Sequence, residues 1–251
     1  MFSPATARAM EDGAMIRLLV ATALSLTAAA PVAAQVVAPP AATAPASDSR
    51  TAQVAALLAA PSIDWAALDR LGIVGIVLST DAGPITLALD RQAAPATVAN
   101  FLRYVDQRRL DGTTIYRAMD LGGGRGLIQG GPRNDPKRVL PPVAHEPTSA
   151  TGLSHGEGTI SLARGAPGTA TADFFITLGD MRGLDASATD PGFAAFGRVI
   201  GGLDMVRAVL ARPRASGGPA GMEGQMLAAP VRIATARRTL PVAPATPQRG
   251  R

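Results

Sequence analysis

The feature that most constrains the fold is a succession of short β-rich runs between Gly72 and Thr239, separated by turn residues such as Gly, Pro and Asp. The runs are Ile73–Leu78, Ile85–Leu89, Thr114–Arg117, Leu127–Ile128, Thr159–Ala163, Phe174–Leu178, Ala194–Ile200 and Val231–Ala236. Two stretches have a helical apolar period instead, one after Pro95 and one over Leu203–Leu210. About eight strands with two helices at the ends predict a mostly β fold, a closed eight-stranded antiparallel barrel capped by two α-helices.

The N-terminus has the pattern of a secretory signal peptide. Arg17 precedes a short apolar run, Leu18–Leu26, and small residues lead to an expected cleavage after Ala34. We therefore assign residues 1–34 to the signal, with a start that is over-extended if Met10 or Met15 initiates, and expect a periplasmic or secreted protein with no membrane contact after cleavage. An uncleaved membrane anchor is the alternative, although the apolar run is shorter than the ~20 residues that span a bilayer.

The remaining chain divides by composition. Residues 35–71 are an Ala/Pro-rich linker followed by a short helical extension, in which apolar residues flank Pro61 and are expected to pack on the outside of the main domain. The main domain covers residues 72–239. The Pro-, Ala- and Arg-containing residues 240–251 are predicted to be a disordered tail.

Composition excludes several function classes. The chain has no cysteine, which rules out disulfides, thiol catalysis, zinc–cysteine sites and a lipoprotein anchor. Its only histidines, His145 and His155, lack the helical spacing of metal ligands, so no metal is expected. The net charge of +5 would suit nucleic acid, but the arginines are scattered without interleaved aromatics, so we expect no nucleic-acid partner.

Two glycine-containing motifs do not support catalysis. Gly152–Gly156 satisfies the G-x-S-x-G pattern of α/β-hydrolases, but no buried strand precedes it and no histidine follows His155 in the chain. Gly122–Gly126 lacks a P-loop lysine and dinucleotide-binding spacing, and is interpreted as a flexible loop.

Six sequence pieces, in one consistent order, resemble the cyclophilin-type peptidyl-prolyl cis-trans isomerases. They run from about Val77 to Thr235 and comprise Gly83–Ile85 with Ala94–Leu102, Asp111–Arg117, Ile128–Gly131, Gly158–Arg164, Asp173–Ile176, and Phe193–Val199 with Gly202–Val206. The long form TGLSHGEGTISLAR is similar to the secreted bacterial branch. The resemblance implies a cyclophilin-like barrel, a substrate groove on its outer face, proline-containing polypeptides as substrates and no cofactor.

The resemblance also implies roles for individual residues. Arg117 matches the catalytic arginine, and Gln129 matches the glutamine that orients it and binds substrate backbone. The residues that match substrate-binding positions are Leu127, Phe175, Leu184, Phe193, Ala163 and Arg164. A surface position for Arg117, a turn position for Gln129 and a core position for the apolar residues remain the alternatives.

The chain departs from the family pattern around the groove. About four extra residues separate Arg117 from Gln129, and Gly126 stands where an aromatic is expected. Leu121 and Leu127 are candidates to fill that gap. Gly183 replaces a groove tryptophan and Asp173 replaces a glutamine. Losing one aromatic wall removes roughly 1–3 kcal/mol of transition-state binding. Sequence therefore predicts a slow, monomeric isomerase assisting protein folding, with a weak or inactive proline-peptide binding module as the alternative.

Overall fold

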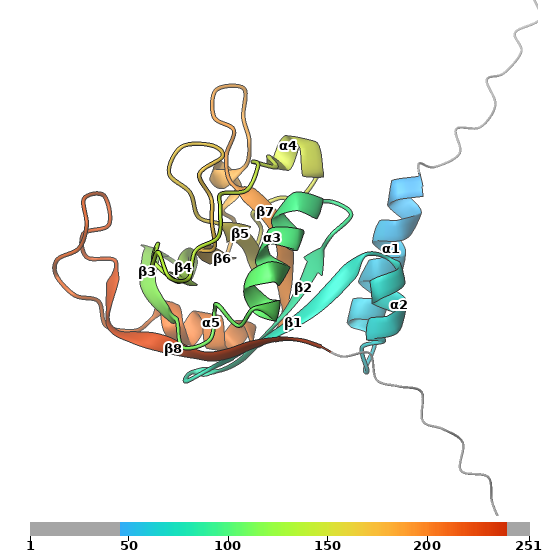
Figure 1. The fold of residues 1–251 in the computed structure, drawn as a ribbon. Coiled ribbons are helices and arrows are strands. Elements are labelled where there is room, and N and C mark those ends of the chain that lie inside the picture. Colours follow the sequence, from blue (N-terminus) through green and yellow to red (C-terminus); the bar gives the residue numbers. More distant parts are fainter. Residues whose placement is uncertain (1–45, 240–251) are drawn as a thin grey trace, which may run out of the picture. The chain divides into compact units, whose positions relative to one another are not determined.

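The strands of the computed structural model, which describes residues 46–239, close into a barrel in the order β1-β2-β7-β5-β6-β4-β3-β8, with every neighbouring pair antiparallel (Figure 1). The strands are β1 Ile73–Thr80, β2 Gly83–Asp90, β3 Thr114–Gly122, β4 Arg125–Gly131, β5 Thr159–Leu162, β6 Phe174–Leu178, β7 Ala194–Gly201 and β8 Met226–Arg238. The helices are α1 Ala46–Ala59, α2 Trp65–Arg70, α3 Pro95–Asp106, α4 Thr148–Thr151 and α5 Leu203–Leu210, with a 3₁₀ turn, η1, over Arg182–Leu184. The predicted eight-stranded antiparallel barrel is confirmed.

Side chains fill the barrel interior. On α3 the predicted apolar face, including Phe101, is buried, and the Phe101 ring meets those of Phe174 and Phe196 at centroid distances of 5.8 and 5.2 Å. Strand residues one position apart alternate between this core and the outer surface, as the two-residue period of a strand requires. Because the interior is packed, a substrate has to bind on the outside of the barrel.

The hairpin of β3 and β4 differs from the sequence interpretation. Gly122–Gly126 was expected to be a flexible loop, but the two strands continue to Gly122 and Arg125 and leave a tight turn at their tips. Gly122, Gly123 and Gly124 all have positive φ, a backbone region in which only glycine is unstrained. The extra residues therefore lengthen a hairpin beside the groove rather than forming a separate loop.

Helices α1 and α2 pack on the outer side of β1. Leu68 is fully buried against Ile73, and Trp65 lies so close to Gly75 that a Cβ there would stand 2.4 Å from the indole ring. Arg50 of α1 forms two hydrogen bonds with the Asp90 carboxylate, at 3.0 and 2.8 Å. The helical extension is thus attached to the barrel wall by both apolar and charged contacts.

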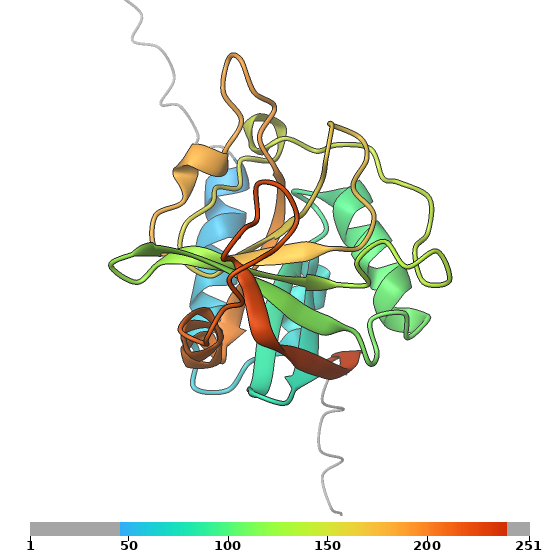
Figure 2. The ribbon, with the colours of Figure 1, turned by 90° about the vertical axis from the view of Figure 1, so that its left-hand side faces the viewer.

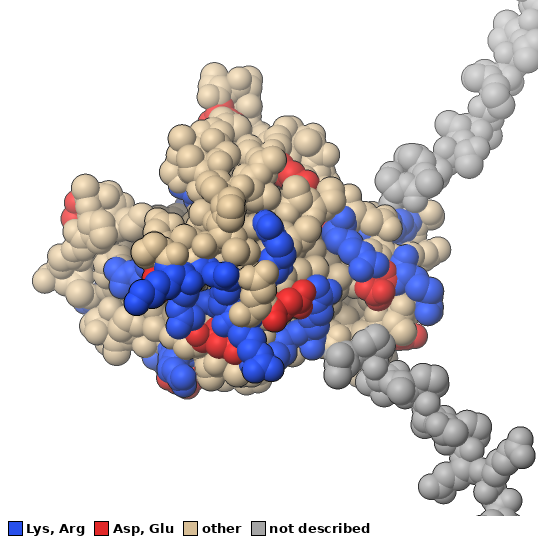
Figure 3. Space-filling model, viewed as in Figure 1, with Lys and Arg blue, Asp and Glu red and all other residues tan. Residues whose placement is uncertain are grey.

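The face shown in Figure 3 gathers Lys and Arg side chains over α3 and β8, interleaved with acidic residues. Arg237 pairs with Asp111 at 2.7 Å and Arg238 with Asp106 at 2.6 Å. The predicted signal peptide and tail lie outside the described residues. Within residues 46–239, no helix has the length and apolar character needed to cross a bilayer.

Candidate active site

A pocket of about 280 Å³ opens on the outer face of strands β3, β4 and β6. Its lining residues are Arg117, Met119, Leu127, Gln129, Ala163, Arg164, Phe175, Leu184, Phe193 and Met222. All eight residues predicted for catalysis or substrate binding therefore lie around one cavity. Register explains the convergence, because Arg117 pairs with Gln129 and Gln129 pairs with Phe175 across adjacent strands, so their side chains share one face.

The Arg117 guanidinium is held from two sides. Its Nη1 donates to Gln129 Oε1 at 2.7 Å, and its Nε and Nη2 both donate to Gln225 Oε1, at 2.9 and 2.6 Å. Nη2 also lies 3.8 Å from the Met119 sulfur. Burial lowers the pKa of Arg117, but an arginine remains protonated at neutral pH, so the pocket contains a fixed positive charge with directed N–H groups.

Gln129 is oriented by its own partners. Its Oε1 accepts from Arg117, while its Nε2 donates to the Tyr116 hydroxyl at 2.8 Å. Both ends of the buried carboxamide are thus used, and its acceptor end faces the arginine. Burial raises the pKa of Tyr116, so its hydroxyl stays neutral and remains a suitable partner for this amide.

The apolar wall of the pocket is centred on Phe175. Its ring meets Phe193 edge to face at a centroid distance of 5.3 Å, and Leu127 is buried in the same cluster. Leu121, a candidate to replace the missing aromatic, has 50% of its surface exposed. Leu127, the other candidate, lines the pocket, and Met119 lines it too because it lies two residues beyond Arg117 and therefore on the same strand face.

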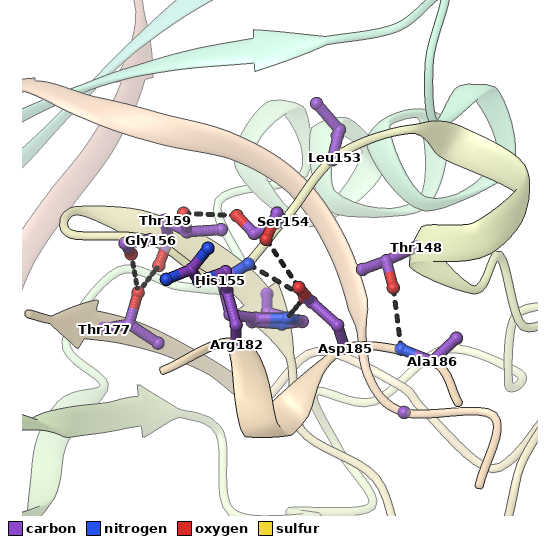
Figure 4. Close-up of polar contacts among 12 residues, drawn as sticks. Thr148, Leu153, Ser154, His155, Gly156, Thr159, Thr177, Arg182, Asp185 and Ala186 are labelled. Carbon is purple, nitrogen blue, oxygen red and sulfur yellow. Dashed lines mark hydrogen bonds and ion pairs between the residues drawn. The ribbon is translucent and has the colours of Figure 1, made fainter. Parts of the chain in front are cut away.

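A hydrogen-bonded histidine, His155, lies behind this wall in contact with Phe175, and Figure 4 shows it beside Asp185. His155 Nδ1 is 2.6 Å from Asp185 Oδ1, and His155 Nε2 is 3.0 Å from Ser161 Oγ. Asp185 also accepts a hydrogen bond from the Ser154 hydroxyl at 2.5 Å. Since His155 and Ser161 are fully buried, this Ser-His-Asp arrangement presents no nucleophile to solvent, and it supports the pocket wall instead.

The two residues that follow β5, Ala163 and Arg164, already form contacts within the protein. Arg164 stacks over the Phe193 ring at 4.8 Å, and its Nε donates to the Gly192 carbonyl at 2.9 Å. The Ala163 N–H donates to the Asp173 carbonyl at 2.8 Å. Arg164 therefore fixes one wall of the pocket through its side chain, and a substrate strand has to bond to backbone groups other than the Ala163 N–H.

The groove continues beyond the first pocket. A second hollow of about 540 Å³ shares Gln129, Ala163, Arg164 and Met222 with it and extends past Tyr116 to Asp173. Burial raises the pKa of the Asp173 carboxyl, whose Oδ1 accepts a hydrogen bond from the Arg133 N–H at 2.9 Å. The shared residues make one continuous surface that is longer than a single proline.

Sequence reasoning missed three site residues, Met119, Met222 and Gln225. The alternation of strand residues could have identified Met119. Met222 and Gln225 come from the loop between α5 and β8, and Gln225 is 108 positions from the arginine that it contacts, so no local pattern indicates them. Among the described residues, no group of three His, Cys, Asp or Glu side chains is arranged to bind a metal ion.

Comparisons with known proteins agree with the fold. Residues 75–237 match the family model of the cyclophilin type peptidyl-prolyl cis-trans isomerase/CLD. The chain is 38% identical over 134 residues to peptidyl-prolyl cis-trans isomerase A of Dickeya dadantii, covering 52% of this chain and 67% of the relative. It is 38% identical over 141 residues to peptidyl-prolyl cis-trans isomerase cyp18 of Streptomyces antibioticus, covering 53% and 81%.

A solved structure supports the same architecture. The Cryptosporidium parvum cyclophilin type isomerase, determined in the presence of the dipeptide Ala-Pro, superposes with a TM-score of 0.54 at 20% identity, over 66% of this chain and 99% of that chain. At this identity the match concerns the fold alone. Together with the family model and the relatives' sequences, it leads to one assignment: the chain belongs to the cyclophilin-type peptidyl-prolyl cis-trans isomerases and is an enzyme of that class.

Proposed function

We propose that this isomerase rotates X–Pro bonds of extracytoplasmic polypeptides in the pocket of Arg117 and Phe175, and thereby assists their folding. The observation that carries the proposal is the guanidinium of Arg117, held at the edge of an apolar cavity lined by Phe175, Leu127 and Met119. A proline ring is apolar and compact, whereas the amide that has to rotate is polar. The cavity offers matching surfaces for both.

The chemistry needs no covalent bond and no cofactor. The barrier to X–Pro rotation is the loss of amide resonance, which makes uncatalysed exchange take tens to hundreds of seconds. Twisting the bond localises a lone pair on the prolyl nitrogen. An N–H of Arg117 directed at that nitrogen stabilises the twisted state more than either planar state, which is the condition for catalysis. Gln129 keeps the guanidinium in place and offers hydrogen bonds to the substrate backbone.

The apolar wall of the pocket binds the proline ring. Phe175, Leu127 and Leu184 contact the ring while the flanking peptide lies along the groove toward Tyr116 and Asp173. Holding the ring while the residue before it turns confines the motion to the bond that has to rotate. Gly183 leaves one side of this grip open, so we expect a lower rate than that of a site with an aromatic there.

The expected location rests on the sequence of residues 1–34, which reads as a cleavable signal, and on the similarity of Thr151–Arg164 to the secreted branch. N-terminal sequencing of the mature protein, recovered from a cell fractionation, tests it. A mature chain that starts near Gln35 outside the cytoplasm supports the proposal. A full-length chain in the membrane fraction means a tethered barrel, and one in the cytoplasm contradicts it.

The activity is tested by NMR exchange of a short X–Pro peptide with the full chain, Arg117→Ala and Arg91→Ala. Arg91 forms an exposed ion pair with Asp69 and serves as the matched control. Acceleration that survives Arg91→Ala but falls at least ~100-fold in Arg117→Ala, about 2.7 kcal/mol, supports the assignment. Equal rates for wild type and Arg117→Ala contradict it.

Gly183, where a tryptophan is expected, favours a second candidate function, a binding module that holds proline-containing peptides without useful turnover. Changes in the NMR chemical shifts of the peptide, without faster cis/trans exchange, in the wild type and in both variants would support the binding module. The absence of nucleic-acid, metal and cofactor partners and the monomeric state remain predictions. Sedimentation of the purified chain, alone and with an oligonucleotide, measures the oligomeric state and nucleic-acid binding.

A further inference from the structure

We infer that Gln225 is a positioning residue for Arg117, fixing the guanidinium so that its terminal edge faces the substrate pocket. This inference rests on the proposed role of Arg117. Gln225 belongs to the loop that connects α5 to β8, which Figure 2 shows in red in front of the strands that carry the pocket. The same loop contributes Met222 to the pocket lining.

A count of hydrogen-bond donors identifies the edge that remains for substrate. A guanidinium has five N–H groups, one on Nε and two on each terminal nitrogen. Gln225 Oε1 accepts from Nε and Nη2, the side edge, at 2.9 and 2.6 Å, and Gln129 Oε1 accepts from Nη1 at 2.7 Å. The remaining Nη1 and Nη2 donors form the terminal edge. On this edge Nη2 lies 3.8 Å from the Met119 sulfur, which is a weak acceptor that a peptide group can replace.

The backbone around Gln225 is fixed, so its side chain can serve as a rigid support. The Gln225 carbonyl accepts from the Ala118 N–H of β3 at 2.8 Å, and the Gln225 N–H donates to the Met222 carbonyl at 3.1 Å. The Ala215 N–H also bonds to the Met226 carbonyl at 2.8 Å. These bonds tie the loop both to itself and to the strand that carries Arg117, so the Gln225 side chain extends from a backbone that is anchored beside the guanidinium.

The arrangement explains why a single glutamine would not be sufficient. Gln129 holds only Nη1, and one hydrogen bond leaves the planar group free to turn about that contact. Two further bonds to one oxygen on the opposite side remove this freedom, because a planar fork held at both ends has a single orientation. Fixing the donor in its reactive orientation before substrate binds is what makes electrostatic stabilisation effective.

The test is a double-mutant cycle on kcat and KM for a short X–Pro peptide, measured by NMR exchange. Gln225→Met keeps the side-chain volume but removes the oxygen acceptor, and Gln53→Met, at an exposed position of α1, is the matched control. We expect Gln225→Met to lower kcat about tenfold, with KM changed less than about twofold, since positioning acts on the transition state. Gln53→Met should equal wild type. In the Arg117→Ala background Gln225→Met should cause no further loss, because the two residues act together.

The outcomes separate this inference from the proposed function. If Arg117→Ala is inactive and Gln225→Met retains the wild-type kcat, the inference is wrong and the role of Arg117 stands. A further fall in the Arg117→Ala background also overturns it, because Gln225 would then act independently of the arginine. If Arg117→Ala equals wild type, the proposed function itself fails. The Arg117 Nε–H resonance gives a second readout, since it should be protected from solvent exchange in folded wild type and lose that protection in folded Gln225→Met.

Discussion

The imidazole of His155 lies nearly parallel to the ring of Phe175, at a centroid distance of 5.8 Å and an interplanar angle of 17°. The aromatic wall of the candidate pocket thus rests on a buried histidine, which is itself held between Asp185 and Ser161. Asp185 directly follows Leu184, another pocket residue. One hydrogen-bond network therefore fixes two walls of the pocket from behind.

Replacing His155 by alanine should weaken both the fold and substrate binding. The change removes a fully buried ring, and Asp185 and Ser161 each lose their hydrogen bond to the imidazole. Together these losses should lower the free energy of unfolding by about 3 kcal/mol. Phe175 would lose its support, so KM should rise several-fold while the Arg117 contacts persist. Urea unfolding and peptide exchange measure the two effects. An unchanged KM in a folded variant would show that Phe175 does not depend on His155.

The same histidine should give stability a pH dependence. Burial lowers the pKa of His155 below its usual 6.5, against the opposing hydrogen bond and charge of Asp185. Below about pH 6.5 the unfolded chain then binds more protons than the folded one. The contribution of His155 to the free energy of unfolding is therefore complete above that pH and is lost as the pH falls toward the pKa of the folded state. The slope of this loss is at most about 1.4 kcal/mol per pH unit.

Two glutamine variants isolate this titration. His155→Gln should abolish the loss of stability between about pH 6.5 and 5, whereas His145→Gln should keep it. Comparing the two variants separates the titration of His155 from that of the other ionisable groups. Burial raises the pKa of Asp173, so its titration has the opposite sign. For Asp185, burial is outweighed by the hydrogen bonds from Ser154 and His155, and its lowered pKa makes its contribution disappear only in more acidic solution. Identical slopes in wild type and His155→Gln would contradict the prediction.

The groove should accept a new aromatic at Gly183 but not at Gly126. A Cβ at Gly183 meets no atom within 4 Å, whereas one at Gly126, where φ is +156°, would stand 2.1 Å from the Met119 carbonyl oxygen. We expect Gly183→Trp to raise kcat/KM roughly 3- to 10-fold by restoring about 1 kcal/mol of aromatic contact. Gly126→Ala, by contrast, should destabilise the hairpin. Peptide exchange measures the effect of Gly183→Trp, and thermal unfolding measures that of Gly126→Ala. A slower Gly183→Trp enzyme would contradict the prediction that an aromatic at this position improves binding of the proline ring.

The helical extension should depend on one charged contact. Arg50 donates to both Asp90 oxygens and, through Nε at 2.9 Å, to the Leu71 carbonyl. Arg50→Met keeps the apolar stem but removes these bonds, which should cost about 1–3 kcal/mol of docking free energy. Limited proteolysis should then cut within α1 faster, while peptide exchange at the distant pocket remains at the wild-type rate. Unchanged proteolysis would mean that Trp65 and Leu68 hold the extension by themselves.

Local pattern accounts for much of what sequence could predict. Short β-rich runs between turn residues predicted the strands, and a helical apolar period predicted α3 and α5, because these signals come from neighbours in the chain. Arg117, Gln129 and Phe175 were predicted because contiguous motifs around them resemble those of the cyclophilin-type isomerases. The interpretation of Gly122–Gly126 differed from the structure, since glycine runs suit both flexible loops and tight hairpin turns, and only the pairing of β3 with β4 distinguishes them.

The sequence by itself thus determined the barrel, its two principal helices and the eight residues that were expected around the groove. Only the tertiary structure decided what surrounds Arg117: Gln225 on its side edge, Met119 and Met222 in the lining, and His155 behind Phe175. The reason is physical. Strand and helix periods are local properties of the backbone, but a contact between residues 108 positions apart depends on how the closed barrel brings a loop to a strand, which no local period records.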